Sequence, residues 1–222
     1  MYEIFTKETM GIIGVTMQMA FTSTTISLVL GITLGLLLEK SRFPGKRVVI
    51  RILRTLMGTP PVVAGLVVYL LLMRQGPLGF LGLLFTVRGM IIAQILIITP
   101  IVTGMVHSAA SRNAPQIRFF AKTMGAHGMQ AKLLIIREMR GEIYFTAVTA
   151  FGRAISEVGS VMLVGGNILH KTRTMTTAIS LMQNRGNFTE AITLGVMLLG
   201  IAFVLQSLAD FFHHPGLAEE NI

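Results

Sequence analysis

The chain has 222 residues, of which 52% are hydrophobic and 13% charged, and its mean hydropathy is +0.70. A soluble domain carries about 25% charged residues because it needs a solvated surface. This composition therefore excludes a soluble globule and indicates an integral membrane protein. The absence of cysteine excludes disulfides, cysteine-based metal centres and thiol catalysis, and the single aspartate, Asp210, excludes magnesium–phosphate chemistry built on paired aspartates.

Long stretches without charge predict the membrane-spanning helices. A helix rises about 1.5 Å per residue, so about 20 residues cross a hydrocarbon core of roughly 30 Å. We expect an all-α fold in which residues 1–222 form a single transmembrane domain, with five helices at residues 11–38, 55–73, 89–108, 143–165 and 190–212. Two further segments are too short to span: 78–87 is expected to be interfacial or re-entrant, and 171–187 to carry a short surface helix.

The distribution of Lys and Arg predicts the orientation. The connections 39–54 and 109–142 carry six basic residues each, whereas the N-terminus and the loops 74–88 and 166–189 together carry six. Because short basic loops stay in the cytoplasm, both basic connections are predicted to be cytoplasmic. The N-terminus is then outside the plasma membrane and the C-terminus inside. This bias accounts for most of the net charge of +9, so we expect no nucleic-acid partner.

The 109–142 connection is long enough to form helices that project into the cytoplasm. Pro115 can begin one helix, with Asn113 as its cap. The two glycines of 123–128 interrupt the helical pattern, which resumes over 130–139. The segment therefore predicts a helix, a glycine turn and a second helix, which together make a knob presented to a partner.

The knob resembles the EAA loop of ATP-binding cassette (ABC) importer permeases. Ala121, Gly125 and Ile135 have the spacing of that loop, while Phe119 and Phe120 replace its Glu and first Ala. Arg137 and Glu138 stand where the loop has Leu and Pro. Five further segments are similar to the second and fourth spans and outer loops of oxyanion permeases: 57–69, 74–79, 151–159, 164–167 and 172–179. The combination most resembles the tungstate-specific branch, with molybdate and sulfate permeases as near relatives.

The resemblance implies a type I ABC importer permease fold and a homodimer with a central pathway in the lipid bilayer. It also implies two cytoplasmic ATPase subunits, which hold ATP and Mg, and an extracytoplasmic binding protein that delivers the oxyanion. The chain itself is then a non-catalytic subunit without a cofactor. The residues implied to couple it to the ATPase are Ala121, Lys122, Thr123, Met124, Gly125, Ala126, His127, Gly128 and Ile135.

Arg153 and Glu157 are four residues apart near the middle of the fourth predicted span, so they share one helix face. A central charge costs on the order of 2.5–3.5 kcal/mol in a membrane, and we expect the two side chains to pair. Two interpretations stay open. The pair is either a gate or anion-sensing element beside the pathway, or a neutralised pair that holds the bundle together.

Other polar and proline positions in the spans have the same ambiguity. Thr59, Pro60, Pro61 and Pro100 can free backbone groups for a pathway, or the prolines can simply bend helices for packing. Asn167, in an outer loop, completes the pathway candidates. The hydroxyl-bearing run 22–27 either lines a wet groove or bonds to its own helix, and the glycines of 31–35 form a helix-contact motif.

Three classes of function compete: a permease subunit powered by a separate ATPase, an ion-coupled secondary transporter, and a membrane enzyme. Secondary transporters tend to show internal repeats, and none is visible. A membrane enzyme needs a carboxylate cluster or a nucleophile–base pair, and neither is present, so we expect no catalytic residue. Residues 165–172 approach a P-loop, but His170 replaces its second glycine. The five histidines have no metal-ligand spacing.

Overall fold

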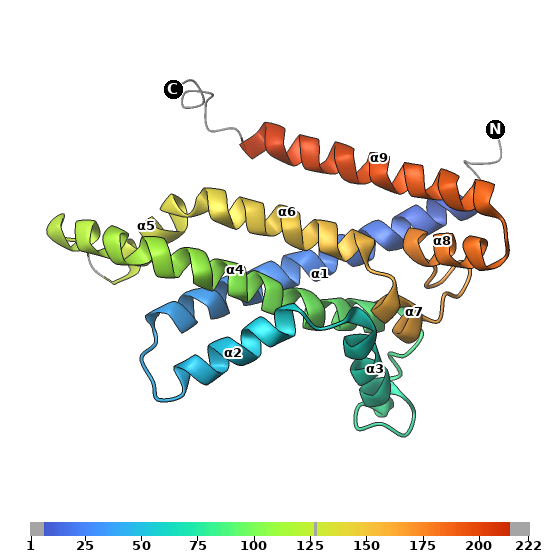
Figure 1. Ribbon diagram of the computed structural model, residues 1–222, viewed down its shortest axis with the longest axis horizontal. Helices are drawn as coiled ribbons and strands as arrows, with labels where there is room; N and C mark the ends of the chain where they lie inside the picture. Colours follow the sequence, from blue (N-terminus) through green and yellow to red (C-terminus); the bar gives the residue numbers. More distant parts are fainter. Residues whose placement is uncertain (1–6, 127, 214–222) are drawn as a thin grey trace.

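The computed structural model describes residues 7–126 and 128–213, so His127 of the predicted coupling residues lies outside the described part. Within it the fold is all-helical (Figure 1). The elements are α1 (Lys7–Lys40), α2 (Lys46–Met57), α3 (Pro61–Leu72), the short 3-10 helix η2 (Gly79–Leu81), α4 (Val87–Thr123), α5 (Met129–Glu138), α6 (Arg140–Ser156), α7 (Gly159–Gly165), α8 (Met175–Asn184) and α9 (Phe188–His213).

Three helices, α1, α4 and α9, are each long and apolar enough to cross a membrane alone. Two further pairs of helices meet the same criterion only when taken together, each as a broken span or a re-entrant loop: α2 and α3 meet at 100°, and α6 and α7 meet at 54°. The prediction of single continuous helices at 55–73 and 143–165 is therefore wrong. Consecutive prolines at 60 and 61 interrupt the first of them, and the second is interrupted at Glu157 and Val158, where no proline is present.

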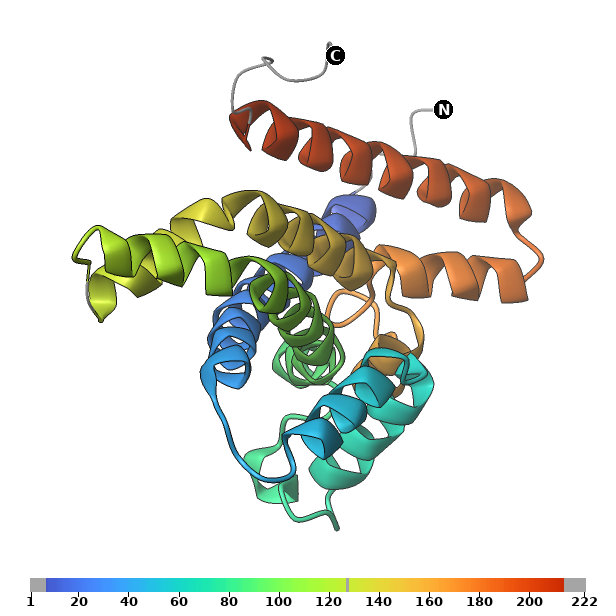
Figure 2. The same cartoon turned by 60° about the vertical axis from the view of Figure 1, so that its left-hand side comes forward.

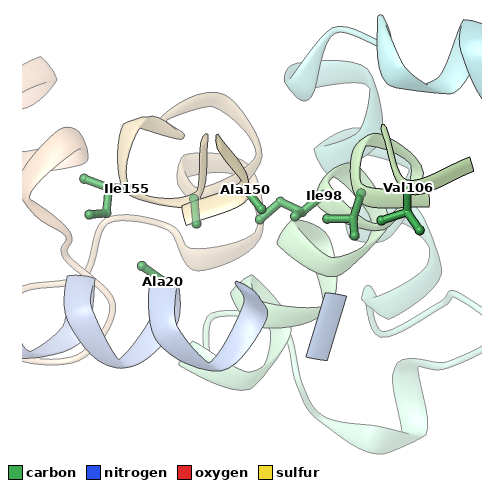
Figure 3. Packing of buried hydrophobic residues seen from close by; sticks show 7 residues of the cluster. Ala20, Ile98, Val106, Ala150 and Ile155 are labelled. Carbon is green, nitrogen blue, oxygen red and sulfur yellow. The ribbon is translucent and has the colours of Figure 1, made fainter. Parts of the chain in front are cut away.

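The core lies where α1, α4 and α6 pack together. Ala20, Ile98, Val106, Ala150 and Ile155 meet there with almost no exposed surface (Figure 3). Gly31 and Gly35 of α1 face two valines of α4, and a Cβ added at Gly31 would lie 2.5 Å from the Cγ1 atom of Val102. The helix-contact interpretation of these glycines is confirmed.

The peripheral helices are arranged around this core. Figure 1 shows α3 standing across the long helices, and Figure 2 shows α9 lying along the outside next to α8. Most large apolar side chains of α9 are exposed, as expected for a helix that lies against lipid. The segment 78–87 is a short turn-rich connection that contains η2, so it does not span. The expected surface helix is α8, but its first turn, Met175–Ala178, is buried.

The helix α4 corrects another prediction. Pro115 does not begin a helix, because α4 runs without a break through Pro100 and Pro115 to Thr123. Asn113 is not a cap: its Nδ2 donates to Oε1 of Glu142 at 2.7 Å and so ties α4 to α6. The apolar span and the first half of the predicted cytoplasmic segment are thus one helix, which carries the knob directly.

Candidate functional site: two helix breaks and a projecting turn

The two helix breaks lie against each other. A Cβ added at Gly159, the first residue of α7, would come within 2.6 Å of Cγ2 of Val62 in α3, and one added at Gly65 would come within 2.5 Å of Cα of Ser160. Only glycine permits so close a backbone approach. The short helices α3 and α7 therefore form one tightly packed pair, which is joined to α2 and α6 through the breaks.

Side chains from three elements satisfy the backbone groups that the break after α6 exposes. Gln94 of α4 donates from Nε2 to the carbonyl oxygen of Ala154 at 2.8 Å, and Thr176 of α8 donates from Oγ1 to the carbonyl oxygen of Glu157 at 2.9 Å. The Glu157 carboxylate accepts from the backbone N–H of Ser160 at 3.2 Å. A buried backbone group without a partner is costly, so these bonds make the break a specified part of the fold.

Arg153 and Glu157 pair, as predicted, with Nη2 and Oε2 3.4 Å apart. They do not share a continuous helix, because α6 ends at Ser156 and Glu157 has extended backbone angles. The Glu157 side chain is 4% exposed and that of Arg153 is 37% exposed. The carboxylate is thus buried inside the break, while the Arg153 side chain is partly exposed and its Nε is buried. This geometry is compatible with both interpretations of the pair.

Thr59, Pro60 and Pro61 form the other break. Thr59 and Pro100 line a small cavity of about 70 Å³ together with Ile97, and Ile97 also borders the space beside Arg153 and Glu157. The structure therefore brings these pathway candidates together around residues 94–100, in the first half of α4. In α1, Ser23 and Ser27 are buried, and Ser23 donates to Oε1 of Gln94 at 2.5 Å. These two serines belong to the packing against α4 and do not line a wet groove.

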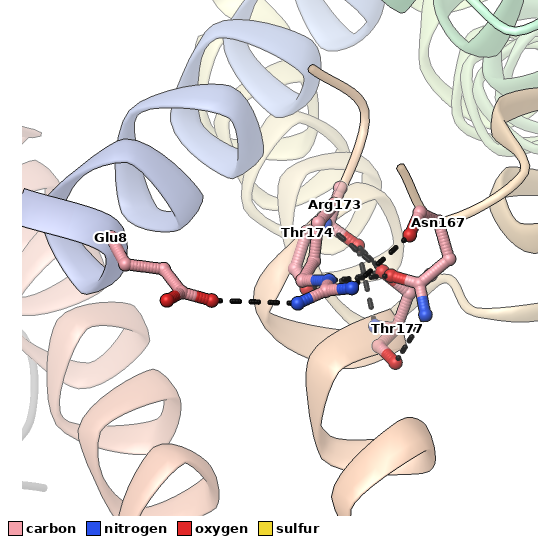
Figure 4. Close-up of polar contacts among 5 residues, drawn as sticks. All are labelled: Glu8, Asn167, Arg173, Thr174 and Thr177. Atoms are coloured by element: carbon pink, nitrogen blue, oxygen red, sulfur yellow. Dashed lines mark hydrogen bonds and ion pairs between the residues drawn. The ribbon is translucent and has the colours of Figure 1, made fainter. Parts of the chain in front are cut away.

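Asn167 lies elsewhere, in the loop between α7 and α8. Its Oδ1 accepts from Nε of Arg173 at 3.2 Å, and Nη1 of Arg173 lies 3.4 Å from Oε1 of Glu8 in α1 (Figure 4). Thr174 caps α8 and forms a capping box with Thr177. Asn167 and His170 have positive φ angles. The loop is therefore held by polar contacts within itself, to α8 and to Glu8 of α1, and its near-P-loop sequence forms a plain turn.

The knob is the turn between α4 and α5. Gly125 has φ of 76°, and the N–H groups of Gly125 and Ala126 donate to the carbonyl oxygens of Lys122 and Ala121, which is the Schellman arrangement of a helix end. The prediction that Gly125 enters the left-handed region is confirmed. Ala121 and Ile135 are both buried, and Ile135 packs with Ala109, Ala110 and Ala114 of α4 and so holds α5 against that helix.

The tip of the knob is exposed and largely apolar. Lys122, Thr123, Gly125 and Gly128 are exposed there, and Ala126 is half-buried. Large apolar side chains surround them, with Met124 at 84% exposure: Phe119, Phe120, Met124, Met129 and Leu133. A contiguous exposed apolar patch on a projecting element marks an interaction surface. An ion pair between Arg118 and Glu39 braces the stem of the knob against α1.

Sequence reasoning missed Gln94, Ser23, Thr176 and Ser160 as parts of the break after α6. One signal for Gln94 was available, because it is the one carboxamide in the uncharged stretch 89–111. No local pattern marks Thr176, because its contact with the break joins residues 19 apart in the chain. Within the described residues no three His, Cys, Asp or Glu side chains converge to hold a metal ion.

These features define the class of protein: a multi-pass helical membrane protein with broken spans and a projecting turn, which is the architecture of a transport component. Residues 27–214 match the family of binding-protein-dependent transport system inner membrane components. The chain belongs to this family, and it is therefore a multi-pass inner-membrane permease component with the type I ABC permease fold.

Individual relatives agree with this assignment. The chain is 41% identical over 204 residues to the tungstate uptake system permease protein TupB of Peptoclostridium acidaminophilum, which covers 92% of this chain and 90% of that protein. It is 38% identical over 212 residues to a probable anion ABC transporter permease protein of Haloferax volcanii, covering 92% and 91%. It is 30% identical over 210 residues to the sulfate transport system permease protein CysW of Escherichia coli, covering 90% and 72%.

Proposed function

We propose that this chain is the permease subunit of an ABC importer for tungstate. The observation that carries the proposal is the similarity to TupB, which is 41% over nearly the full length of both chains, against 30% over 72% of the sulfate permease CysW. Molybdate or sulfate is the alternative cargo. An ion-coupled secondary transporter is disfavoured, because the family depends on a binding protein.

The partners follow from the same assignment. The importer comprises a homodimer of this chain, two cytoplasmic ATPase subunits that bind ATP and Mg, and an extracytoplasmic oxyanion-binding protein. The chain itself is non-catalytic and binds no cofactor. The exposed apolar tip around Met124 supports docking of the knob to the ATPase. This requires the knob in the cytoplasm, and hence the N-terminus outside and the C-terminus inside.

The paired breaks support a gate in the translocation pathway. The α3–α7 pair is joined to α2 through Thr59-Pro60-Pro61 and to α6 through Glu157, and its buried side chains pack on Ala93 of α4. In this proposal the pair tilts as a unit over that contact while the long helices keep their packing on one another. Arg153 lies beside the second break, and its side chain is partly exposed. An oxyanion that passes the open gate would meet this cation, whose charge Glu157 otherwise neutralises.

Transport measurements test the proposal. The permease is reconstituted in vesicles with the ATPase and binding protein encoded beside it, and ATP-dependent uptake of tungstate, molybdate and sulfate is measured singly and in competition. We expect tungstate to be taken up, and molybdate and sulfate to compete only in large excess. Uptake of sulfate in preference to tungstate would reject the cargo, and uptake without ATPase would reject the class of transporter.

A further inference from the structure

The helix α2 has two different exposed sides and no buried residue. Lys46, Ile50, Leu53 and Met57 are its half-buried positions and recur at the spacing of one helix face, the face packed on α4. At about 100° per residue, Arg47, Arg51 and Arg54 lie on one flank about 60° wide. The other flank carries Val48, Val49, Ile52 and Leu56, which are 42–56% exposed.

The basic flank has no acidic partner among residues 7–126 and 128–213. Among the residues that the structure describes, Arg47, Arg51 and Arg54 take part in no ion pair. The nearby carboxylate of Glu39 is already paired with Arg118. Lys46 is also engaged, since its Nζ donates to the carbonyl oxygens of Glu39 and Ser41 at 3.0 Å. Three arginines on one flank are therefore available to an external anion.

The position of α2 along the bundle places these arginines at a membrane surface. Met57, at one end, contacts Gly104 of α4, and Lys46, at the other, bonds to the end of α1. The uncharged stretch of α4 ends at Arg112, between the level of Gly104 and the level of the end of α1. An element at this level, with one apolar and one basic flank, has the properties of an interfacial helix.

We propose that the basic flank of α2 binds the phosphate groups of anionic phospholipids in the leaflet that surrounds it, while the apolar flank enters the acyl region. Guanidinium groups suit this ligand because they bond two phosphate oxygens at once. Clusters of basic residues on amphipathic helices beside a membrane span recognise anionic lipid. A second copy of the chain fits less well, because a two-fold contact through this flank would oppose like charges. The proposal does not depend on the identity of the cargo.

The bound lipid would have a mechanical consequence for the break at Thr59. The helix α2 leads directly into Gly58 and the prolines that follow. Anchoring α2 at the headgroup level fixes one side of this break, so motion of α3 would be confined to the other side. Anionic lipid is thus placed to hold the frame against which the α3–α7 pair tilts.

The test compares lipid retention by purified variants. The permease alone, in mixed micelles with equimolar phosphatidylglycerol and phosphatidylcholine of identical acyl chains, is separated from free lipid, and the bound ratio is measured by mass spectrometry. We expect the wild type to be enriched several-fold in phosphatidylglycerol, and the triple variant R47Q/R51Q/R54Q to lose most of that enrichment. Each arginine near an anionic surface contributes about five-fold. The variant R47K/R51K/R54K keeps the charge and should keep most of the enrichment.

A matched control removes three exposed arginines from the opposite side of the protein, as R74Q/R88Q/R185Q, with the same change in net charge. This control should retain the wild-type ratio. Equal losses in both glutamine variants would reduce the effect to general charge, and an unchanged ratio in R47Q/R51Q/R54Q would overturn the site. Displacement of phosphatidylglycerol by excess sodium tungstate would assign the arginines to free oxyanion and overturn the lipid assignment. No partner protein is present, so failure of the transport assay is distinguishable from failure here.

Discussion

Gln94 offers the most direct test of whether the break after α6 is specified by the fold. Its side chain is fully buried, and its Nε2 satisfies the carbonyl oxygen of Ala154. In Gln94→Leu the volume is nearly conserved, but this carbonyl is stranded. A buried acceptor left without a partner costs about 1–3 kcal/mol, so we expect the free energy of unfolding to fall by that amount.

The second bond of Gln94 adds little to this loss. Ser23 donates to Oε1 of Gln94, but its hydroxyl also donates to the carbonyl oxygen of Ala20 at 3.2 Å. The serine therefore keeps a partner in Gln94→Leu. The double variant Ser23→Ala/Gln94→Leu should lie within about 1 kcal/mol of the single variant, because the two residues share one interaction and their effects do not add.

The assay is denaturant unfolding of the purified permease in micelles, followed by circular dichroism. Thr103→Val is the matched control, because Thr103 is also buried but its hydroxyl bonds only to the carbonyl oxygen of Thr99 within α4, at 2.7 Å. It should change stability by less than about 0.5 kcal/mol. If Gln94→Leu is as stable as this control, the carbonyl at the break does not need its partner and the reasoning fails.

Three further predictions concern the ion pair, the knob and the orientation. Arg153→Met and Glu157→Gln should each lower thermal stability, and the double variant should recover much of the loss, because removing one partner leaves the other charge unpaired. Additive losses of thermal stability would show that the two residues do not act as a pair. A stable double variant that fails in transport would favour the gate. Gly125→Val forces a branched side chain into a left-handed conformation at a cost of about 1–2 kcal/mol, and should insert normally but lose the rise in ATPase activity with loaded binding protein; a normal rise would exclude coupling through this turn. The chain lacks cysteine, so in intact cells an impermeant thiol reagent should label Arg185→Cys and spare Met124→Cys, and the reverse pattern would invert the topology.

Patterns formed by residues close together in the chain predicted much of the fold. Uncharged stretches located the three long apolar helices α1, α4 and α9, and the short stretch at 78–87 was correctly expected not to cross. The glycine at 125 marked a turn that uses its conformational freedom. The pairing of Arg153 with Glu157 also followed from sequence, since a charge in an apolar span needs a near neighbour. Each of these properties depends on residues close together in the chain.

The features that the sequence analysis did not predict depend on contacts between residues far apart in the chain. The break at Glu157 contains no proline; it exists because Gln94 and Thr176 satisfy the exposed carbonyls and because Gly159 admits Val62. Conversely, Pro115 was expected to begin a helix and instead lies inside one, since Asn113 bonds to Glu142 and so joins that helix to α6. Propensity was overridden in both directions by tertiary packing.

Because α4 is continuous, it connects the knob mechanically to the helix break beside Gln94. At about 1.5 Å per residue its 37 residues extend for about 55 Å, and the close contact of Gly31 and Gly35 with Val102 and Val106 supplies a fulcrum. The arm from this contact to the knob is about 29 Å long and the arm to Gln94 about 15 Å. If α4 pivoted rigidly at this contact, a sideways displacement of the tip would reach the helix break with about half its amplitude and the opposite sign; bending at Pro100 and Pro115 would reduce that amplitude. In the importer proposed above, a push that brings the two knobs together would therefore move the far ends of the two α4 helices apart.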